Sequence, residues 1–319
     1  MSFKSRNLLI VARRLMPSIH SIITDKNKLI FTVITIVFTF VILGYLIFSQ
    51  WHILVTYNWK LRPIYLVVAF VIYSLILLFN TLTWTSIIRN FGSKKDFGIH
   101  FRSTTISALG KRLPGTFWYV IWRAQLYKEE FTGPVIAYAS GVEMVITVIA
   151  AIIISSIFAI PLILKYQYSL WVIVLMLIIC IVVLHPKILA WSFKKLKLNV
   201  DRIPYKFYLF WVGLYLIIWL LVGLLLFLFG NFFSDIPIND LPYFIGSTAL
   251  TGVISRLLLF SPSTFGFGEI SLSLLLSNIL PSSFAVVIAI SNRIFIISYE
   301  LIWALISTLS TKSELQSQN

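Results

Sequence analysis

Six charged residues stand inside long apolar stretches of this sequence, and their types bound the chemistry that the chain can perform. They are Arg123, Glu143, Arg256, Glu269, Arg293 and Glu300. A charge at the centre of a membrane-spanning helix costs about 2.5–3.5 kcal/mol on insertion scales, so such residues are functional candidates by default. Cations and carboxylates at that depth can hold a charged group, and a buried carboxyl can also carry a proton.

The stretch 109–115 reads Leu-Gly-Lys-Arg-Leu-Pro-Gly and predicts a helix that ends in a tight turn. Pro114 cannot continue a helix, and Gly115 tolerates the positive φ that turns often need. Backbone groups freed at such a turn cannot face lipid, so the turn must be buried in protein or line a polar cavity. Lys111 and Arg112 place positive charge beside it, which suits the phosphate or carboxylate of a lipid head group.

Two tryptophans and an arginine follow this turn. Trp118 and Trp122 are four residues apart and therefore share one helix face. An interfacial aromatic anchor is the common role of such residues, and an aromatic wall beside a head-group pocket is the alternative. We favour the anchor for the tryptophans and a functional role for Arg123.

Glu143 falls in the first turns of the next apolar stretch, after the small residues of the segment 139–141. Small residues let a neighbouring helix approach closely. A carboxylate at that depth needs a partner, and Arg123 and Arg293 are the candidates. The alternative to a functional pair is a purely structural one.

A second interruption, 261–269, holds a proline, two glycines and three hydroxyl side chains before an apolar helix. Ser263 or Thr264 is expected to cap that helix, and the free N–H groups at its start suit an anion. Glu269 then enters the membrane at the start of the helix. The two glycines, Gly266 and Gly268, would be a weak signal alone, and their place between membrane segments strengthens it.

The composition shows what must position these residues. The 319 residues are 59% hydrophobic and 12% charged, whereas soluble proteins carry roughly a quarter charged residues. Several apolar blocks reach the ~20 residues that a helix needs to cross the hydrocarbon core. The sequence therefore predicts an all-α polytopic membrane protein with six full spans: 29–48, 64–88, 134–160, 168–184, 205–230 and 282–309.

Two less regular segments, 99–127 and 241–280, lie between these spans and are expected to be re-entrant or broken helical hairpins. The order span, span, broken hairpin, span then occurs twice, over 29–160 and 168–309. Three crossings in each unit make the second unit inverted, which is the recurrent plan of secondary transporters. The alternative is eight or so full spans without inverted symmetry, since 241–260 is long enough to cross the membrane.

The net charge of +15 lies mainly in the connections between apolar blocks. This is the positive-inside pattern, and it predicts a multi-pass protein of the cell (plasma or inner) membrane with both termini cytoplasmic. We expect residues 1–28 to form a basic interfacial segment and 310–319 a short polar tail. No nucleic-acid motif is present, and neither the four histidines nor Cys180, the lone cysteine, has the spacing of a metal or cofactor site.

Together these residues resemble the transmembrane family of lysylphosphatidylglycerol synthases and flippases. The matching stretches are 84–92, 109–118 with Arg123, Glu143 at the family's spacing, 262–269 and Arg293 in the last span. The resemblance covers about 29–309. The second loop departs from the family pattern Pro-x-x-Gly-Gly-Leu-Gly-x-x-Glu, because Thr264-Phe265 stands near its first glycine and Phe267-Gly268-Glu269 closes it tightly.

The resemblance implies the lipid-translocating part of the family without the soluble aminoacyltransferase domain of its two-domain members. The expected function is a lipid translocase for an anionic or aminoacylated phospholipid or a lipid-linked glycan intermediate. An intramembrane head-group transferase and a non-transporting partner of a cell-envelope enzyme are the alternatives, and a homo-oligomer is a further expectation. No catalytic residue, metal ligand or cofactor is assigned.

Overall fold

The computed structural model describes residues 59–111, 117–159, 203–257 and 267–317, together with Phe48, Trp51 and Val55. All regular secondary structure in these ranges is helical. The elements are α5 (Ile64–Asn90), α6 (Phe97–Gly110), α7 (Phe117–Leu126), α8 (Gly133–Phe158), α12 (Tyr205–Phe233), the short 3₁₀ helix η1 (Ile238–Asp240), α13 (Leu241–Leu257), α14 (Phe267–Leu276) and α15 (Ser282–Ser317).

Four of these helices, α5, α8, α12 and α15, are long and apolar enough to cross a membrane, which is consistent with a membrane protein. Each coincides to within a few residues with a span predicted from hydropathy, although α15 continues as a helix to Ser317, through the first eight residues of the expected tail. The expected spans 29–48 and 168–184 lie outside the described residues, apart from Phe48, and so does the basic segment 1–28.

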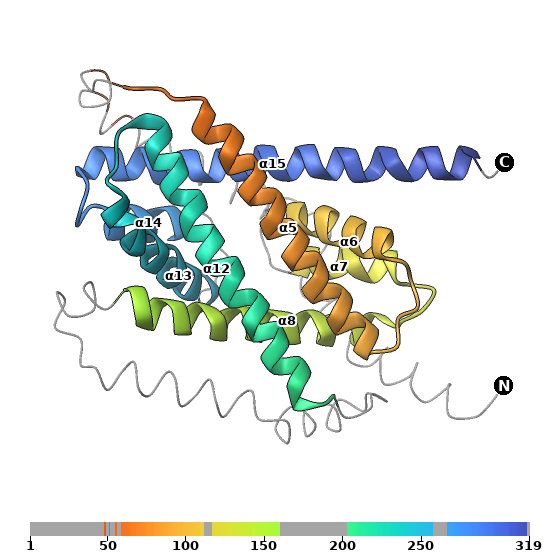
Figure 1. The fold of residues 1–319 in the computed structure, drawn as a ribbon. Helices are drawn as coiled ribbons and strands as arrows, with labels where there is room; N and C mark the ends of the chain where they lie inside the picture. Colours follow the sequence, from red (N-terminus) through yellow and green to blue (C-terminus); the bar gives the residue numbers. More distant parts are fainter. Residues whose placement is uncertain are drawn as a thin grey trace, which may run out of the picture.

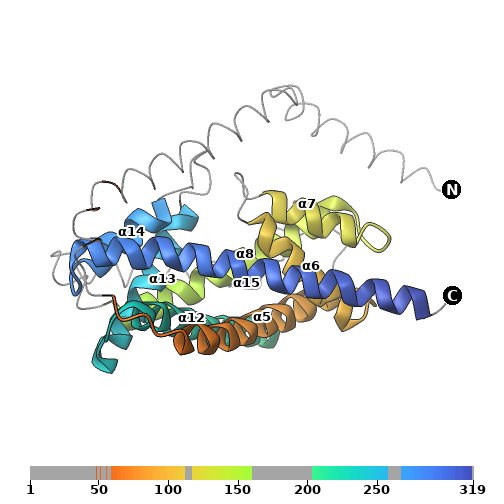
Figure 2. The same cartoon turned by 90° about the horizontal axis from the view of Figure 1, so that it is seen from above.

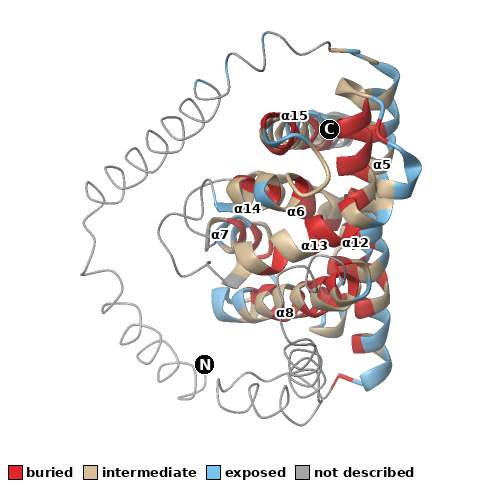
Figure 3. Ribbon diagram, turned by 90° about the vertical axis from the view of Figure 1, so that its left-hand side faces the viewer, coloured by how far each residue is buried: buried red, intermediate tan, exposed pale blue. Residues whose placement is uncertain are grey.

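The long helices form two crossing sets. Helices α5 and α12 pack along each other, while α8 and α15 flank the bundle and run in opposite directions (Figure 1). Seen along the bundle, α5 and α12 form one layer, and the other helices are stacked beside them from α15 to α8 (Figure 3). The buried side chains of both layers form the core, which is rich in aromatic and β-branched residues.

Each segment expected to be broken contains a pair of described helices with undescribed residues between them, which makes it an interrupted pair. Helices α6 and α7 pack together on either side of residues 112–116, and α13 and α14 pack together on either side of 258–266. The α6–α7 pair lies toward one end of the bundle and the α13–α14 pair toward the other end (Figure 2). The two interruptions themselves lie outside the described residues.

Glycine ends α5 and starts the connection into the first interrupted pair. Gly92 has a φ of 101°, a conformation that glycine adopts without steric cost. The Gly92 N–H donates to Arg89 O at 2.9 Å and the Ser93 N–H to Ile88 O at 3.1 Å, which caps the helix in the manner of a Schellman motif.

The base of the α6–α7 pair is tied together by Glu130, which follows α7. Its carboxylate accepts a hydrogen bond from the Ser93 hydroxyl at 2.6 Å and from the Lys94 N–H at 3.1 Å. Lys95 and Glu129 form an ion pair at 3.4 Å beside it. The chain entering α6 and the chain leaving α7 are therefore joined at one end of the bundle.

Helix α13 packs against its neighbours through glycines. A Cβ on Gly246 would lie 2.6 Å from the backbone carbonyl of Phe158 at the end of α8, and a Cβ on Gly252 would overlap the Trp219 ring of α12. Small residues at such positions let helices approach closely. The glycines of α13 thus set its contact with two long helices.

At the end of the bundle near α13, Arg62 and Asp235 form an exposed ion pair, and the Arg62 Nη2 donates to Asp235 Oδ2 at 2.7 Å. This hydrogen bond from Arg62 lowers the pKa of the Asp235 carboxyl below its ordinary value. Asp240 ends η1, a few residues after Asp235, whereas Arg89 is in the last turn of α5 and Lys94 bonds to Glu130 at the base of the α6–α7 pair.

Candidate functional site

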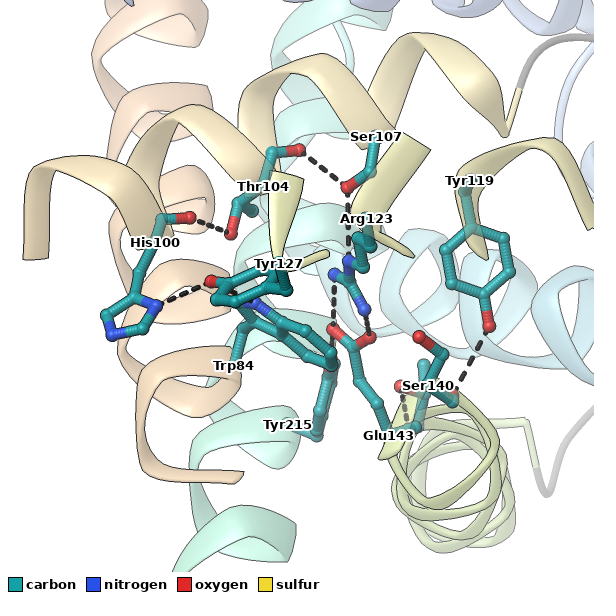
Figure 4. Close-up of polar contacts among 11 residues, drawn as sticks. Trp84, His100, Thr104, Ser107, Tyr119, Arg123, Tyr127, Ser140, Glu143 and Tyr215 are labelled. Atoms are coloured by element: carbon teal, nitrogen blue, oxygen red, sulfur yellow. Dashed lines mark hydrogen bonds and ion pairs between the residues drawn. The ribbon is translucent and has the colours of Figure 1, made fainter. Parts of the chain in front are cut away.

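A fully buried ion pair joins α7 to α8 (Figure 4). The guanidinium of Arg123 faces the carboxylate of Glu143, with Nη1 paired to Oε2 and Nη2 donating to Oε1 at 3.3 Å. The Arg123 side chain is 0% exposed and that of Glu143 is 4% exposed. Of the two partners expected for Glu143, the structure therefore shows Arg123. Fork-to-carboxylate pairing of this kind fixes orientation as well as charge.

Three further helices complete the surroundings of the pair. Arg123 Nε donates to the Ser107 hydroxyl of α6 at 3.3 Å, and the guanidinium lies over the Trp84 ring of α5 at 3.7 Å. From α12, the Tyr215 hydroxyl donates to Glu143 Oε1 at 2.8 Å. Five helices thus meet at one charge pair whose hydrogen-bonding capacity is largely used, as a buried pair requires.

A second polar chain continues from Trp84 toward the base of α6. The Trp84 indole N–H donates to the Tyr127 hydroxyl at 3.0 Å, and that hydroxyl lies 2.5 Å from His100 Nδ1. The rings of His100 and Tyr127 are stacked. These hydrogen bonds connect α5, α6 and the residue after α7, and His100 Nε2 is buried without a hydrogen-bond partner in the described part of the chain.

The second half contains a corresponding pair between α14 and α15. Arg293 Nη1 is paired with Glu269 Oε1, with side chains 17% and 10% exposed. The other carboxylate oxygen, Glu269 Oε2, is buried without a hydrogen-bond partner in the described part of the chain. Gly268, the residue before Glu269, faces the Ser255 hydroxyl of α13, which a Cβ on Gly268 would approach to 3.3 Å.

Two more cations stand at the ends of the first helices of the interrupted pairs. Lys111 is the C-cap residue of α6, and its ammonium lies over the Tyr119 ring at 5.5 Å. Arg256 is in the last turn of α13, and its guanidinium lies over the Trp219 ring at 5.2 Å and donates to Gly252 O at 3.0 Å. Neither forms an ion pair with a carboxylate within the described ranges.

The structure thus gathers part of the expected site. It brings Arg123 to Glu143 and Glu269 to Arg293, and it places Lys111 and Gly268 at the helix ends that flank the interruptions. Trp118 is half-buried and its neighbour on the same face, Trp122, is 46% exposed. The remaining expected residues lie outside the described residues: Arg112, Pro114, Gly115, Ser263, Thr264 and Gly266.

Sequence reasoning gave no role to Tyr215, Ser107, Tyr127, Trp84 or His100. Tyr215 lies in an apolar span 72 residues from its acceptor, and no local spacing links the two. The composition of α6 could have indicated a buried polar site, because the buried residues of this short helix are nearly all polar in an otherwise apolar chain. They are His100, Ser103, Thr104, Thr105, Ser107 and Gly110.

No protein-family model matches this chain, and no curated protein matches it either.

Proposed function

We propose that this chain is a lipid translocase of the flippase-like type. It moves an anionic or aminoacylated phospholipid, or a lipid-linked glycan intermediate, between the leaflets of the cell membrane. One observation carries the proposal: two interrupted helix pairs lie at opposite ends of one apolar bundle, and each is joined to the following long helix by an Arg–Glu pair. Intramembrane ion pairs of this kind mark substrate and ion pathways.

The packing supports an inverted repeat. When α5, α6, α7 and α8 are exchanged for α12, α13, α14 and α15, most of the helix contacts map onto one another. The α5–α6, α7–α8 and α8–α13 contacts become α12–α13, α14–α15 and α15–α6, and α5–α12 maps onto itself. In the proposed arrangement both interrupted pairs are re-entrant, one from each face, and their interruptions meet near the midplane, where transporters bind their substrates.

The inverted arrangement of the two interrupted pairs can be tested by labelling single cysteines from each side of the membrane. In a Cys180→Ser background, we expect Lys128→Cys, beside the base of the α6–α7 pair, to react with a membrane-impermeant thiol reagent only from the cytoplasmic side. Ile238→Cys, at the base of the α13–α14 pair and 66% exposed, should react only from outside. Labelling of both cysteines from the same side would contradict the inverted arrangement.

Movement of the lipid is expected to follow a gradient or to be coupled to an ion. Glu269 is the better candidate for a proton carrier, because one of its oxygens has no hydrogen-bond partner in the described part of the chain, whereas Glu143 is held by Arg123 and Tyr215. A carboxyl without a full set of donors can take up and release a proton with less rearrangement.

Reconstitution tests the function directly. Purified protein in proteoliposomes should exchange fluorescent anionic lipid between leaflets, and Glu269→Gln should lower that exchange at least tenfold while the protein keeps its elution volume and melting temperature. Ser277→Ala, in the turn after the same helix, is the matched control and should exchange lipid like the wild type. Full activity of Glu269→Gln would reject the proton-carrying role.

The same proteoliposomes distinguish lipid translocation from the two alternative functions. An intramembrane transferase would change the lipid head group, which mass spectrometry of the extracted lipids would detect. A non-transporting partner would leave lipids where they are, so exchange no faster than in empty vesicles would reject translocation.

A further inference from the structure

Lys111 and Arg256 occupy equivalent places in the two interrupted pairs. Lys111 caps the C-terminal end of α6, and Arg256 is in the last turn of α13, so each precedes an interruption. A cation at a helix C-terminus is favoured by the helix dipole. The helix dipole explains why a cation is tolerated at each of these positions. It does not neutralise the two positive charges of Lys111 and Arg256 in an apolar bundle.

The partners of these two cations inside the described chain are aromatic rings and a backbone carbonyl. Lys111 lies 5.5 Å from the Tyr119 centroid and Arg256 lies 5.2 Å from the Trp219 centroid. A ring orients a cation but leaves its charge in place. Lys206 at the start of α12 makes a similar contact with Phe207 at 5.5 Å.

The rings that contact the two cations are both held on α8, on either side of Glu143 along that helix. The Tyr119 hydroxyl donates to Ser140 O at 3.2 Å, and the Trp219 indole N–H donates to Thr147 O at 3.0 Å, about two helical turns further on. Glu143 is already neutralised by Arg123, which is fully buried, and Glu300 on α15 interacts with Lys111 more weakly than Glu143 does. Once the Arg123–Glu143 pair is subtracted, the region between the two helix ends keeps a positive charge that attracts an anion in a medium of low dielectric constant.

Accessibility separates these cations from the buried pair. Lys111 is exposed and Arg256 is half-buried, whereas Arg123 has no accessible surface. Lys111 and Arg256 can therefore meet a group that comes from outside the chain, and Arg123 can act only through its neighbours. Tyr119 and Trp219 hold the two cationic stems in place beside that group.

We infer that Lys111 and Arg256 bind one phosphate group between them, with one cation supplied by each interrupted helix pair. An ammonium and a guanidinium are the two side chains that proteins use most for phosphate, the first as a point charge and the second as a planar fork. This inference rests on the proposed function and deepens it, because the phosphate is then that of the translocated head group.

Binding is measured on the full-length protein in a zwitterionic detergent at constant chloride. The probes are inorganic phosphate and dihexanoyl phosphatidylglycerol below its micellar concentration, and the readout is isothermal calorimetry. We expect both probes to bind wild type, with the lipid binding more tightly if the phosphate of a head group is the natural ligand. Tighter binding of inorganic phosphate would keep the phosphate site and assign it to a free anion.

Variants locate the site. Lys111→Gln and Arg256→Gln should each weaken binding about tenfold, and the double variant should lose it. Arg256→Lys and Lys111→Arg keep the charge and should retain binding to within about threefold, which guards against a fold defect. Lys206→Gln removes a surface cation of similar aromatic contact and should have no effect. Wild-type-like binding in the double variant, equal losses for Lys206→Gln, or absence of binding to wild type would each overturn the inference.

Lipid exchange with the same variants distinguishes this inference from the proposed function. If wild type exchanges lipid and the double variant exchanges it equally well, the phosphate site is wrong and translocation stands. If the phosphate site behaves as expected and wild type exchanges no lipid, translocation is wrong and the chain is a phosphate-binding membrane protein.

Discussion

The two Arg–Glu pairs occupy corresponding places in the two halves with the charges exchanged. In the first half the arginine is on α7 and the glutamate on α8, whereas in the second half the glutamate is on α14 and the arginine on α15. Glu143 lies ten residues after the start of α8, and Arg293 lies eleven residues after the start of α15. The same junction is therefore built twice at nearly the same depth along a long helix.

The two junctions differ in how completely the carboxylate is satisfied. Glu143 receives Arg123 on both oxygens and Tyr215 on one of them, in a setting without solvent access. Glu269 receives Arg293 on one oxygen, its other oxygen lacks a hydrogen-bond partner in the described ranges, and the pair is partly exposed. Within the described chain, the first junction therefore holds its carboxylate with more hydrogen bonds than the second junction does.

Removal of each arginine gives the largest contrast. Arg123→Met leaves Glu143 as an unpaired buried charge and should destabilise the protein by about 3–5 kcal/mol. Arg293→Met should cost less than half of that, because Arg293 pairs with only one oxygen of Glu269 and the pair is less deeply buried. Melting in detergent, followed by intrinsic fluorescence, measures both, and an equal or larger loss for Arg293→Met would contradict the comparison.

Tyr215→Phe leaves Glu143 with fewer hydrogen-bond donors, which brings it closer to the situation of Glu269. It removes one donor to Glu143 and should cost about 1.5–3 kcal/mol, the range for a hydrogen bond to a charged group. Tyr208→Phe on the same helix is the matched control, since Tyr208 is buried and its hydroxyl makes no hydrogen bond within the described chain. Similar losses for the two variants would show that the Tyr215 hydroxyl contributes little beyond packing.

The first helices of the two interrupted pairs, α6 and α13, also differ in how closely other atoms approach their glycines. Gly246→Ala places a methyl group against the Phe158 carbonyl and should cost about 1–3 kcal/mol. Gly98→Ala in the corresponding helix α6 meets no atom within 4 Å and should be neutral or stabilising by up to about 1 kcal/mol. Thermal unfolding of both variants tests whether α13 is packed more closely than α6, and a loss of stability in Gly98→Ala would argue against it.

The exposed Arg62–Asp235 pair is expected to contribute less to stability than either Arg–Glu pair. Because Arg62 lowers the pKa of Asp235 in the folded protein, its stabilisation is present above the unfolded pKa and is lost as the pH falls through the folded pKa. Asp235→Asn should slightly weaken the dependence of the melting temperature on pH in that acidic window. Asp240→Asn should leave this pH dependence unchanged. A pH profile that is unchanged in Asp235→Asn would show that the pair contributes nothing measurable, as many surface pairs do.

The four long helices were predictable because length and hydropathy alone decide whether a segment can span a bilayer. Pro114 and Pro262 predict the two interruptions, because proline cannot continue a helix, and both prolines lie outside the described residues. The partner of Glu143 was not, because Arg123 and Arg293 were equally suitable by type and depth. Tyr215 could not be found at all, since only the packing of α12 on α8 brings it to the carboxylate.

The tie at Glu130 has a mechanical consequence. It fastens the chain entering α6 to the chain leaving α7, so any rocking of this pair would pivot about this base, and the displacement would grow toward the far end of α6, where Lys111 lies. A small rotation at the pivot is thereby converted into a larger excursion of the cation. The resistance of the α6–α7 pair to this rotation is then set outside the apolar core, by the two hydrogen bonds that Ser93 and Lys94 donate to Glu130.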